Sequence, residues 1–93
     1  ALDVPPSLGR FKNLSVLLFQ NIVRTLPENI GDLSKLTIIS LPENKDLVEL
    51  PESILNLEDL SFIQLKGSNP NVKIPEDLLK TLDDVGGGFY YKI

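Results

Sequence analysis

Apolar and polar residues alternate along this chain in short segments separated by turn-forming residues. The segment 36–41 carries apolar residues at Leu36, Ile39 and Leu41, Asn44 follows, and the apolar pattern resumes up to Leu50, directly before Pro51. Short alternation predicts a half-buried strand, and an asparagine at its end predicts a turn. A proline after an apolar residue predicts the first position of a short helix.

The same order of strand, turn and helix recurs along the chain. Apolar-proline pairs stand at offsets of 22, 24 and 24 residues, at Val4-Pro5, Leu26-Pro27, Leu50-Pro51 and Ile74-Pro75. Recurrence at such a period is typical of a repeat architecture whose units are stabilised by their neighbours. We predict a single domain, residues 1–93, with a partial unit 1–26, the units 27–50 and 51–74, and a terminal or capping unit 75–93. Because residues 1–4 begin within a unit, we interpret the chain as an excerpt of a longer protein.

The alternation also predicts which side chains point toward the core. In the segment 36–41, Ile39 and Leu41 are predicted to point inward, whereas Ile38 and Ser40 point to solvent. Strands this short cannot bury a face alone, so stacked copies are predicted to form a parallel sheet.

Helices and the chain end complete the predicted elements. The segments 27–36, 51–60 and 75–83 are predicted to hold short α or 3-10 helices, because each opens on a proline followed by a glutamate. The chain end departs from the pattern. Gly86–Gly88 is predicted to be a turn into a last strand, Phe89–Ile93, whose Phe89 covers the last core layer.

The units resemble leucine-rich repeats, whose pattern is LxxLxLxxN, over nearly the whole chain. The first such segment, Leu14-x-x-Leu17-x-Phe19, has Ile22 where Asn is expected. The later segments are Leu36-x-x-Ile39-x-Leu41-x-x-Asn44 and Leu60-x-x-Ile63-x-Leu65-x-x-Ser68, the last with Ser in place of Asn. The segments LPENIGDLSKL and LPESILNLEDL are similar to the LPxxIxxLxxL part of plant and Ras-associated intracellular repeats. The resemblance implies an α/β solenoid, with short parallel strands on the concave face and 3-10 or short helical turns on the convex face. It specifies the fold and names no partner.

Side chains that the pattern leaves pointing outward form three columns across the predicted strands. They are Val16, Ile38 and Phe62 in the first column, Leu18, Ser40 and Gln64 in the second, and Gln20, Pro42 and Lys66 in the third. The first column is wholly apolar, and with Leu18 it predicts an exposed patch of a few hundred Å², on the order of a typical interaction site. We expect a protein partner to bind these nine residues on the concave face, with Phe62 as its apolar anchor. β-branched residues also suit exposed strand positions for conformational reasons alone, and this alternative stays open.

Composition narrows the chemistry. The chain has 9 basic and 13 acidic residues, which argues against a nucleic-acid-binding face, and no apolar run approaches a membrane span. It contains no histidine and no cysteine, so Ser-His-Asp or Cys-His catalysis and metal sites of those ligands are excluded. Gly86–Gly88 lacks the Lys-Ser or Lys-Thr of a phosphate-binding loop. We expect no enzyme activity, no cofactor and no metal, and the lack of cysteine favours an intracellular, cytoplasmic protein.

Three functional hypotheses follow from the repeats. The first is a non-catalytic protein–protein interaction module, or scaffold, that binds an unidentified protein on the concave face. The second is a structural component that stacks in a larger particle, because the N-terminal end shows no cap and is open to neighbouring repeats or chains. The third is the recognition domain of a larger signalling or effector protein.

Overall fold

A five-stranded sheet and a row of short helices make up most of the molecule. The computed structural model describes residues 1–92. Its strands are β1 (Leu2–Asp3), β2 (Val16–Leu18), β3 (Val23–Thr25), β4 (Ile38–Ser40), β5 (Phe62–Gln64), β6 (Leu82–Gly86) and β7 (Phe89–Lys92). Its helices are the 3-10 helices η1 (Pro6–Arg10), η2 (Glu28–Asp32) and η3 (Glu52–Asn56), and the α-helix α1 (Glu76–Leu79).

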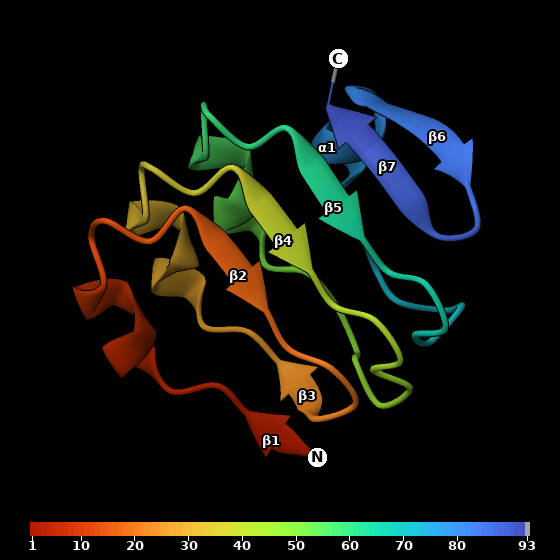
Figure 1. Cartoon of the computed structure of the whole chain (residues 1–93), viewed down its shortest axis with the longest axis horizontal. Helices are drawn as coiled ribbons and strands as arrows, with labels where there is room; N and C mark the ends of the chain where they lie inside the picture. Colours follow the sequence, from red (N-terminus) through yellow and green to blue (C-terminus); the bar gives the residue numbers. More distant parts are fainter. Residues whose placement is uncertain (93) are drawn as a thin grey trace.

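The larger sheet has the strand order β2-β4-β5-β7-β6 (Figure 1). β2, β4 and β5 are parallel, with Val16, Ile38 and Phe62 at one level. β7 runs antiparallel to both β5 and β6. A separate two-stranded parallel sheet joins β1 and β3, near the N-terminus.

The predicted α/β solenoid, with parallel strands on a concave face, is wrong. The five-stranded sheet is mixed, a second sheet stands beside it, and the molecule measures 31 × 30 × 20 Å, so it is as wide as it is long. The reason lies in the chain end, where Gly86, Gly87 and Gly88 all have a positive φ. Glycine adopts this conformation without steric cost, so the chain reverses there and β7 returns antiparallel to β5.

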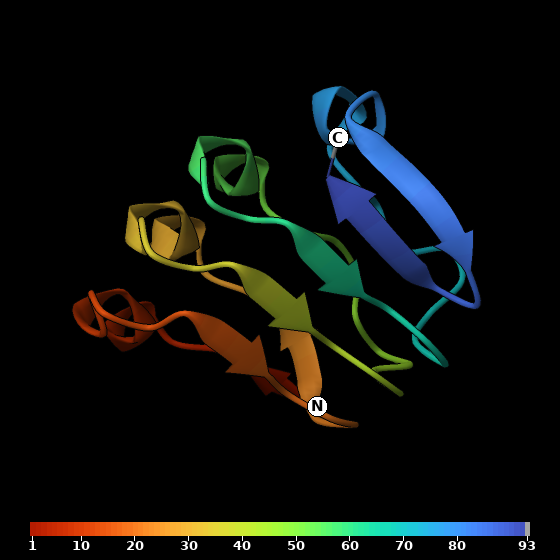
Figure 2. The ribbon, with the colours of Figure 1, turned by 45° about the horizontal axis from the view of Figure 1, so that its top comes forward.

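The short helices form a row along one side of the strands (Figure 2). Each begins after one of the four repeated prolines, which has a φ between −51° and −75° and thus suits the entry to a helix. η1 contacts η2, η2 contacts η3, and η3 contacts α1. η2, η3 and α1 lie inside the segments 27–36, 51–60 and 75–83, which the sequence predicts to be helical.

Apolar side chains from the strands and helices fill one continuous core between the sheet and the helix row. Ile39 and Leu41 are fully buried, as predicted, and so are the helix residues Ile30 and Ile54. Phe11 differs from its counterparts in later units: it is 61% exposed. η1 stands at the N-terminal end of the helix row. No described helix therefore covers Phe11 on the side facing away from η2.

Asn44 holds the turn that follows β4. Its side chain is 1% exposed. Its Oδ1 accepts hydrogen bonds from the N–H groups of Ile22 and Val23, both at 2.9 Å, and its Nδ2 donates to the carbonyls of Phe19 and Pro42. A buried amide side chain is stable only when its polar atoms are paired in this way. The sequence-based interpretation of Asn44 as the turn residue is therefore confirmed.

The β6–β7 hairpin covers the core with a different aromatic residue from the one predicted. Tyr90 stands opposite the buried Ile63 on β5 and packs against the core. Phe89 stands opposite Gln64, on the other face of the sheet. The prediction that Phe89 covers the last core layer is therefore wrong, because adjacent strand residues point to opposite faces. Ile93, which was predicted to end this strand, lies outside the described residues.

Helix length also bears on membranes. Between residues 1 and 92, no helix is long and apolar enough to cross a bilayer.

Candidate functional site: the outer sheet face

One face of the five-stranded sheet points away from the core and presents apolar side chains. We call it the outer sheet face, and it consists of Val16, Leu18, Ile38, Ser40, Phe62, Gln64, Phe89 and Tyr91. The four strands place these residues in two rows, because residues directly opposite each other on neighbouring strands share a face. On each strand, the residue between the two outward-pointing residues packs against the core. This packing fixes the position of the face.

The first row is apolar along its whole length. Val16, Ile38, Phe62 and Tyr91 stand opposite one another on β2, β4, β5 and β7. Val16 is 48% exposed, Tyr91 is exposed to a similar degree, and Ile38 and Phe62 are half-buried. A contiguous exposed apolar row of this kind marks an interaction site more often than isolated apolar residues do.

Phe62 is the centre of an aromatic cluster. Its ring is stacked on that of Phe89, with centroids 5.8 Å apart and planes 18° apart. The Tyr91 ring lies 4.9 Å away at 43°. Such contacts stabilise the pairs by about 0.5–1.5 kcal/mol beyond their buried area. The neighbours therefore hold the Phe62 ring in place, and a partner would meet an ordered aromatic surface.

The second row and the strand ends are more polar. Leu18, Ser40, Gln64 and Phe89 form the second row, in which Leu18 is 62% exposed. The remaining predicted residues, Gln20, Pro42 and Lys66, lie just beyond the ends of β2, β4 and β5. Backbone hydrogen bonds continue there, from Asn21 N–H to the Pro42 carbonyl and from Glu43 N–H to the Lys66 carbonyl.

All nine predicted binding residues therefore lie on three neighbouring strands or at their ends. The face is that of a mixed sheet and not the concave side of a solenoid. Two of its aromatic residues, Phe89 and Tyr91, are not among the nine. The available signal was the aromatic run 89–91 directly after three glycines. It does not say which of the three side chains points outward, because that depends on the pairing with β5.

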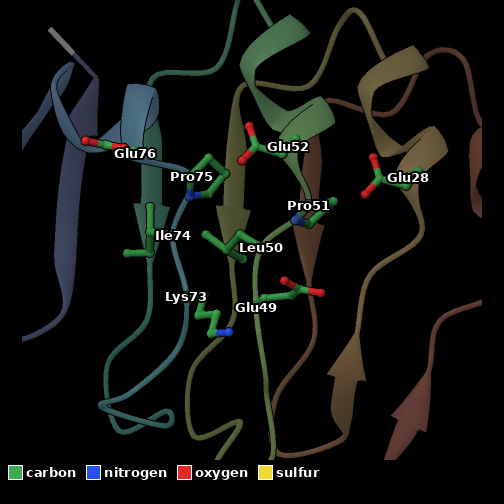
Figure 3. A pocket seen from close by; sticks show the side chains of 9 residues that line it. All are labelled: Glu28, Glu49, Leu50, Pro51, Glu52, Lys73, Ile74, Pro75 and Glu76. Atoms are coloured by element: carbon green, nitrogen blue, oxygen red, sulfur yellow. The ribbon is translucent and has the colours of Figure 1, made fainter.

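A cleft on the helix side is a second candidate site (Figure 3). It has a volume of about 380 Å³ and lies between the segments that carry Pro51 and Pro75. Its charged lining residues are Glu28, Glu49, Glu52, Glu76 and Lys73. All five are exposed, and within residues 1–92 no three His, Cys, Asp or Glu residues are placed to hold a metal ion. The cleft is therefore mainly acidic, but its lining residues do not form a recognisable catalytic or metal-binding arrangement.

An exposed polar cluster joins β1 and β3 near the N-terminus. Arg24 donates two hydrogen bonds to the Asp3 carboxylate, and Thr25 donates a third at 2.8 Å. The hydrogen bonds from Arg24 and then Thr25 lower the pKa of Asp3, and the Asp3 carboxylate raises the pKa of Arg24. Both side chains are exposed, and the cluster ties β1 to β3. Its geometry is that of a structural ion pair.

No family model, curated protein or solved structure matches this chain. The outer sheet face is therefore the main indication of function.

Proposed function

We propose that this chain is a non-catalytic protein-interaction module whose partner binds the outer sheet face. The observation that carries the proposal is the apolar row Val16, Ile38, Phe62 and Tyr91, set in register across four strands. Aromatic residues at the centre of a patch supply much of the binding energy of protein interfaces. Gln64 and Lys66 beside Phe62 provide a polar rim, which typical interfaces also have.

The face suits a protein partner better than a small molecule. Its side chains spread over neighbouring strands of a sheet, whereas small ligands prefer an enclosed, mostly apolar pocket. None of the eight residues of the face is basic, whereas a nucleic-acid-binding face is rich in lysine and arginine.

Substitution of the central aromatic residue tests the proposal. Proteins retained by the immobilised chain are identified, and their affinities are measured for the wild type and for Phe62→Ser. We expect Phe62→Ser to weaken binding by about 30-fold, the loss typical of a central anchor.

A matched pair of valines provides the control. Val16 on the outer sheet face is 48% exposed, and Val48, away from it, is 47% exposed. Val16→Ser is expected to weaken binding, whereas Val48→Ser leaves the affinity unchanged. The wild type, Phe62→Ser and Val16→Ser are checked for folding by circular dichroism. If all three are folded and bind with equal affinity, the partner does not bind the outer sheet face.

The relationship to leucine-rich repeats and the intracellular location are further proposals. The first is supported by the segment Leu36-x-x-Ile39-x-Leu41-x-x-Asn44, and it concerns the origin of the sequence, not the architecture. The second is supported by the absence of cysteine, because disulfides are common in small secreted domains.

A further inference from the structure

The two edges of the five-stranded sheet differ in how they are protected. β6, at one edge, carries the adjacent acids Asp83 and Asp84, and its pairing with β7 is irregular between Asp84 and Gly86. Charges and bulges on an edge strand prevent pairing with other chains. β2, at the other edge, lies in the segment Leu14-Ser-Val-Leu-Leu-Phe19, which has no charge and no proline. The β2 edge is therefore open to a further strand.

The backbone groups that a further strand would meet can be named. Ser15 and Phe19 bond toward β4, since the Ser15 carbonyl accepts from Ile38 N–H and Phe19 N–H donates to the Ser40 carbonyl. Backbone groups alternate sides along a strand. The N–H and C=O groups of Val16 and Leu18 therefore point away from β4, where no strand of the described chain pairs with them.

We propose that two copies of this chain pair antiparallel through β2, with the two-fold axis beside Leu17, to form one continuous ten-stranded sheet. In this register Val16 of each copy stands opposite Leu18 of the other. Val16 and Leu18 are the residues whose backbone groups point outward, so each opposed pair exchanges two hydrogen bonds.

The side chains fit the same register. Opposed residues share a face, so the outward Val16 and Leu18 of the two copies meet on the outer sheet face, and Leu17 meets Leu17 on the core face. No charged residue opposes another within residues 14–19, because this segment contains none.

Exposed apolar surface at the same end of the molecule favours a second copy as the occupant. Phe11 follows η1, which ends the helix row, just as β2 ends the sheet. It is 61% exposed, whereas its counterparts Leu33 and Leu57 are fully buried between helices. An isologous pair places two such end layers against each other, so each copy covers the other's apolar end.

Molecular mass in solution tests the pairing. Sedimentation equilibrium of the wild type is expected to give a concentration-dependent mass that rises from 10.3 kDa to twice that value. The variant Val16→Lys/Leu18→Lys is expected to remain at the monomer mass, because it sets lysines directly opposite lysines. The matched variant Ile38→Lys/Ser40→Lys, on the central strand β4, is expected to keep the dimer. A wild type that stays at 10.3 kDa into the millimolar range overturns the proposal.

Cysteine cross-linking tests the register, because the native chain contains no cysteine. Opposed residues in a hydrogen-bonded antiparallel pair have Cα atoms about 5.5 Å apart, within reach of a disulfide. We expect oxidation of a mixture of Val16→Cys and Leu18→Cys chains to give a cross-linked dimer. Either variant alone is expected to give little, since Val16 and its own copy lie about 8 Å apart diagonally. Cross-linking of Val16→Cys with itself overturns this register.

The two proposals fail separately. A monomeric wild type overturns the pairing through β2 and leaves the Phe62 test of the outer sheet face intact. If the chain forms the dimer but Phe62→Ser leaves partner binding unchanged, the proposed binding function is overturned and the pairing through β2 stands.

Discussion

At the scale of single residues, Asn44 links two neighbouring units of the chain. Its side chain satisfies two backbone N–H groups of the preceding turn and two carbonyls, all from inside the core. Its own backbone N–H donates to Ser68 Oγ, whose hydroxyl donates in turn to the Leu41 carbonyl. Three successive turns are therefore connected through side chains and not through backbone pairing alone.

Asn44→Ala is expected to be strongly destabilising. It leaves the N–H groups of Ile22 and Val23 without an acceptor, and an unsatisfied buried polar group costs about 1–3 kcal/mol. We expect the free energy of unfolding to fall by about 2–4 kcal/mol in urea titrations. Asn69→Ala is the control, because Asn69 makes fewer bonds in a less buried place. A larger loss for Asn69→Ala than for Asn44→Ala would contradict this account.

Asp3 gives the stability a dependence on pH. Hydrogen bonds from Arg24 and Thr25 lower its pKa below the ordinary value of 3.8. A carboxyl whose pKa is lower in the folded state stabilises the fold above its unfolded pKa, and this contribution is lost as the pH falls through the folded pKa. We expect Asp3→Asn to lower the unfolding free energy at pH 7. The difference from wild type should shrink below pH 3.8.

Urea titrations of both proteins at neutral and acidic pH measure this difference. Asp59→Asn serves as the control, because Asp59 is exposed and has no side-chain hydrogen bond to any residue from 1 to 92. If the difference in unfolding free energy between wild type and Asp3→Asn does not change with pH, the ion pair is not its cause.

At the scale of elements, the β6–β7 hairpin decides the architecture. It turns an otherwise parallel sheet into a mixed one, and its β7 completes the outer sheet face. Gly88 extends the pairing between β7 and β5 by one residue beyond the end of β5: its carbonyl accepts the Leu65 N–H at 2.6 Å. A Cβ on Gly88 would lie 2.8 Å from the Lys66 nitrogen, closer than such atoms approach.

Substitution of two glycines separates backbone strain from close approach. Gly86 and Gly88 both have a positive φ, but a Cβ on Gly86 would meet no atom within 4 Å. We expect Gly86→Ala to cost about 1–2 kcal/mol, the strain of the left-handed conformation. Gly88→Ala should cost more, because it also displaces the hairpin from residues 65 and 66. Urea unfolding followed by circular dichroism measures both, and equal losses would show that the hairpin does not rest on β5 as described.

The elements also show what could be predicted from the sequence. The positions of β2, β4 and β5 and of the helices follow from apolar spacing and proline, which are local features. β1 and β3 were missed, because their strand conformation comes from pairing with each other and not from a local apolar pattern. The outer sheet face was predicted on three strands and missed on the fourth, because Phe89, Tyr90 and Tyr91 are all aromatic. The face of the sheet to which each side chain points is set by pairing with β5, a contact between distant parts of the chain.

At the scale of the whole molecule, one apolar core joins all these parts. The same cluster of buried residues runs from Val4, before η1, to Leu78 in α1, and Tyr90 of β7 packs against it. A core shared in this way couples the hairpin to strands two positions away in the sheet. Small domains with one core usually unfold in a single cooperative transition.

Leu41→Ala tests this coupling. Leu41 is fully buried, and its N–H donates to the Gln64 carbonyl at the end of β5. Removing the side chain leaves a cavity and should lower the unfolding free energy by about 2–5 kcal/mol. The chain has no tryptophan, and both of its tyrosines lie in β7. Tyrosine fluorescence therefore reports on the hairpin, whereas far-ultraviolet circular dichroism reports on all elements. We expect the substitution to shift both urea transitions to the same lower midpoint, and a fluorescence transition left at its wild-type midpoint would show that the hairpin unfolds separately.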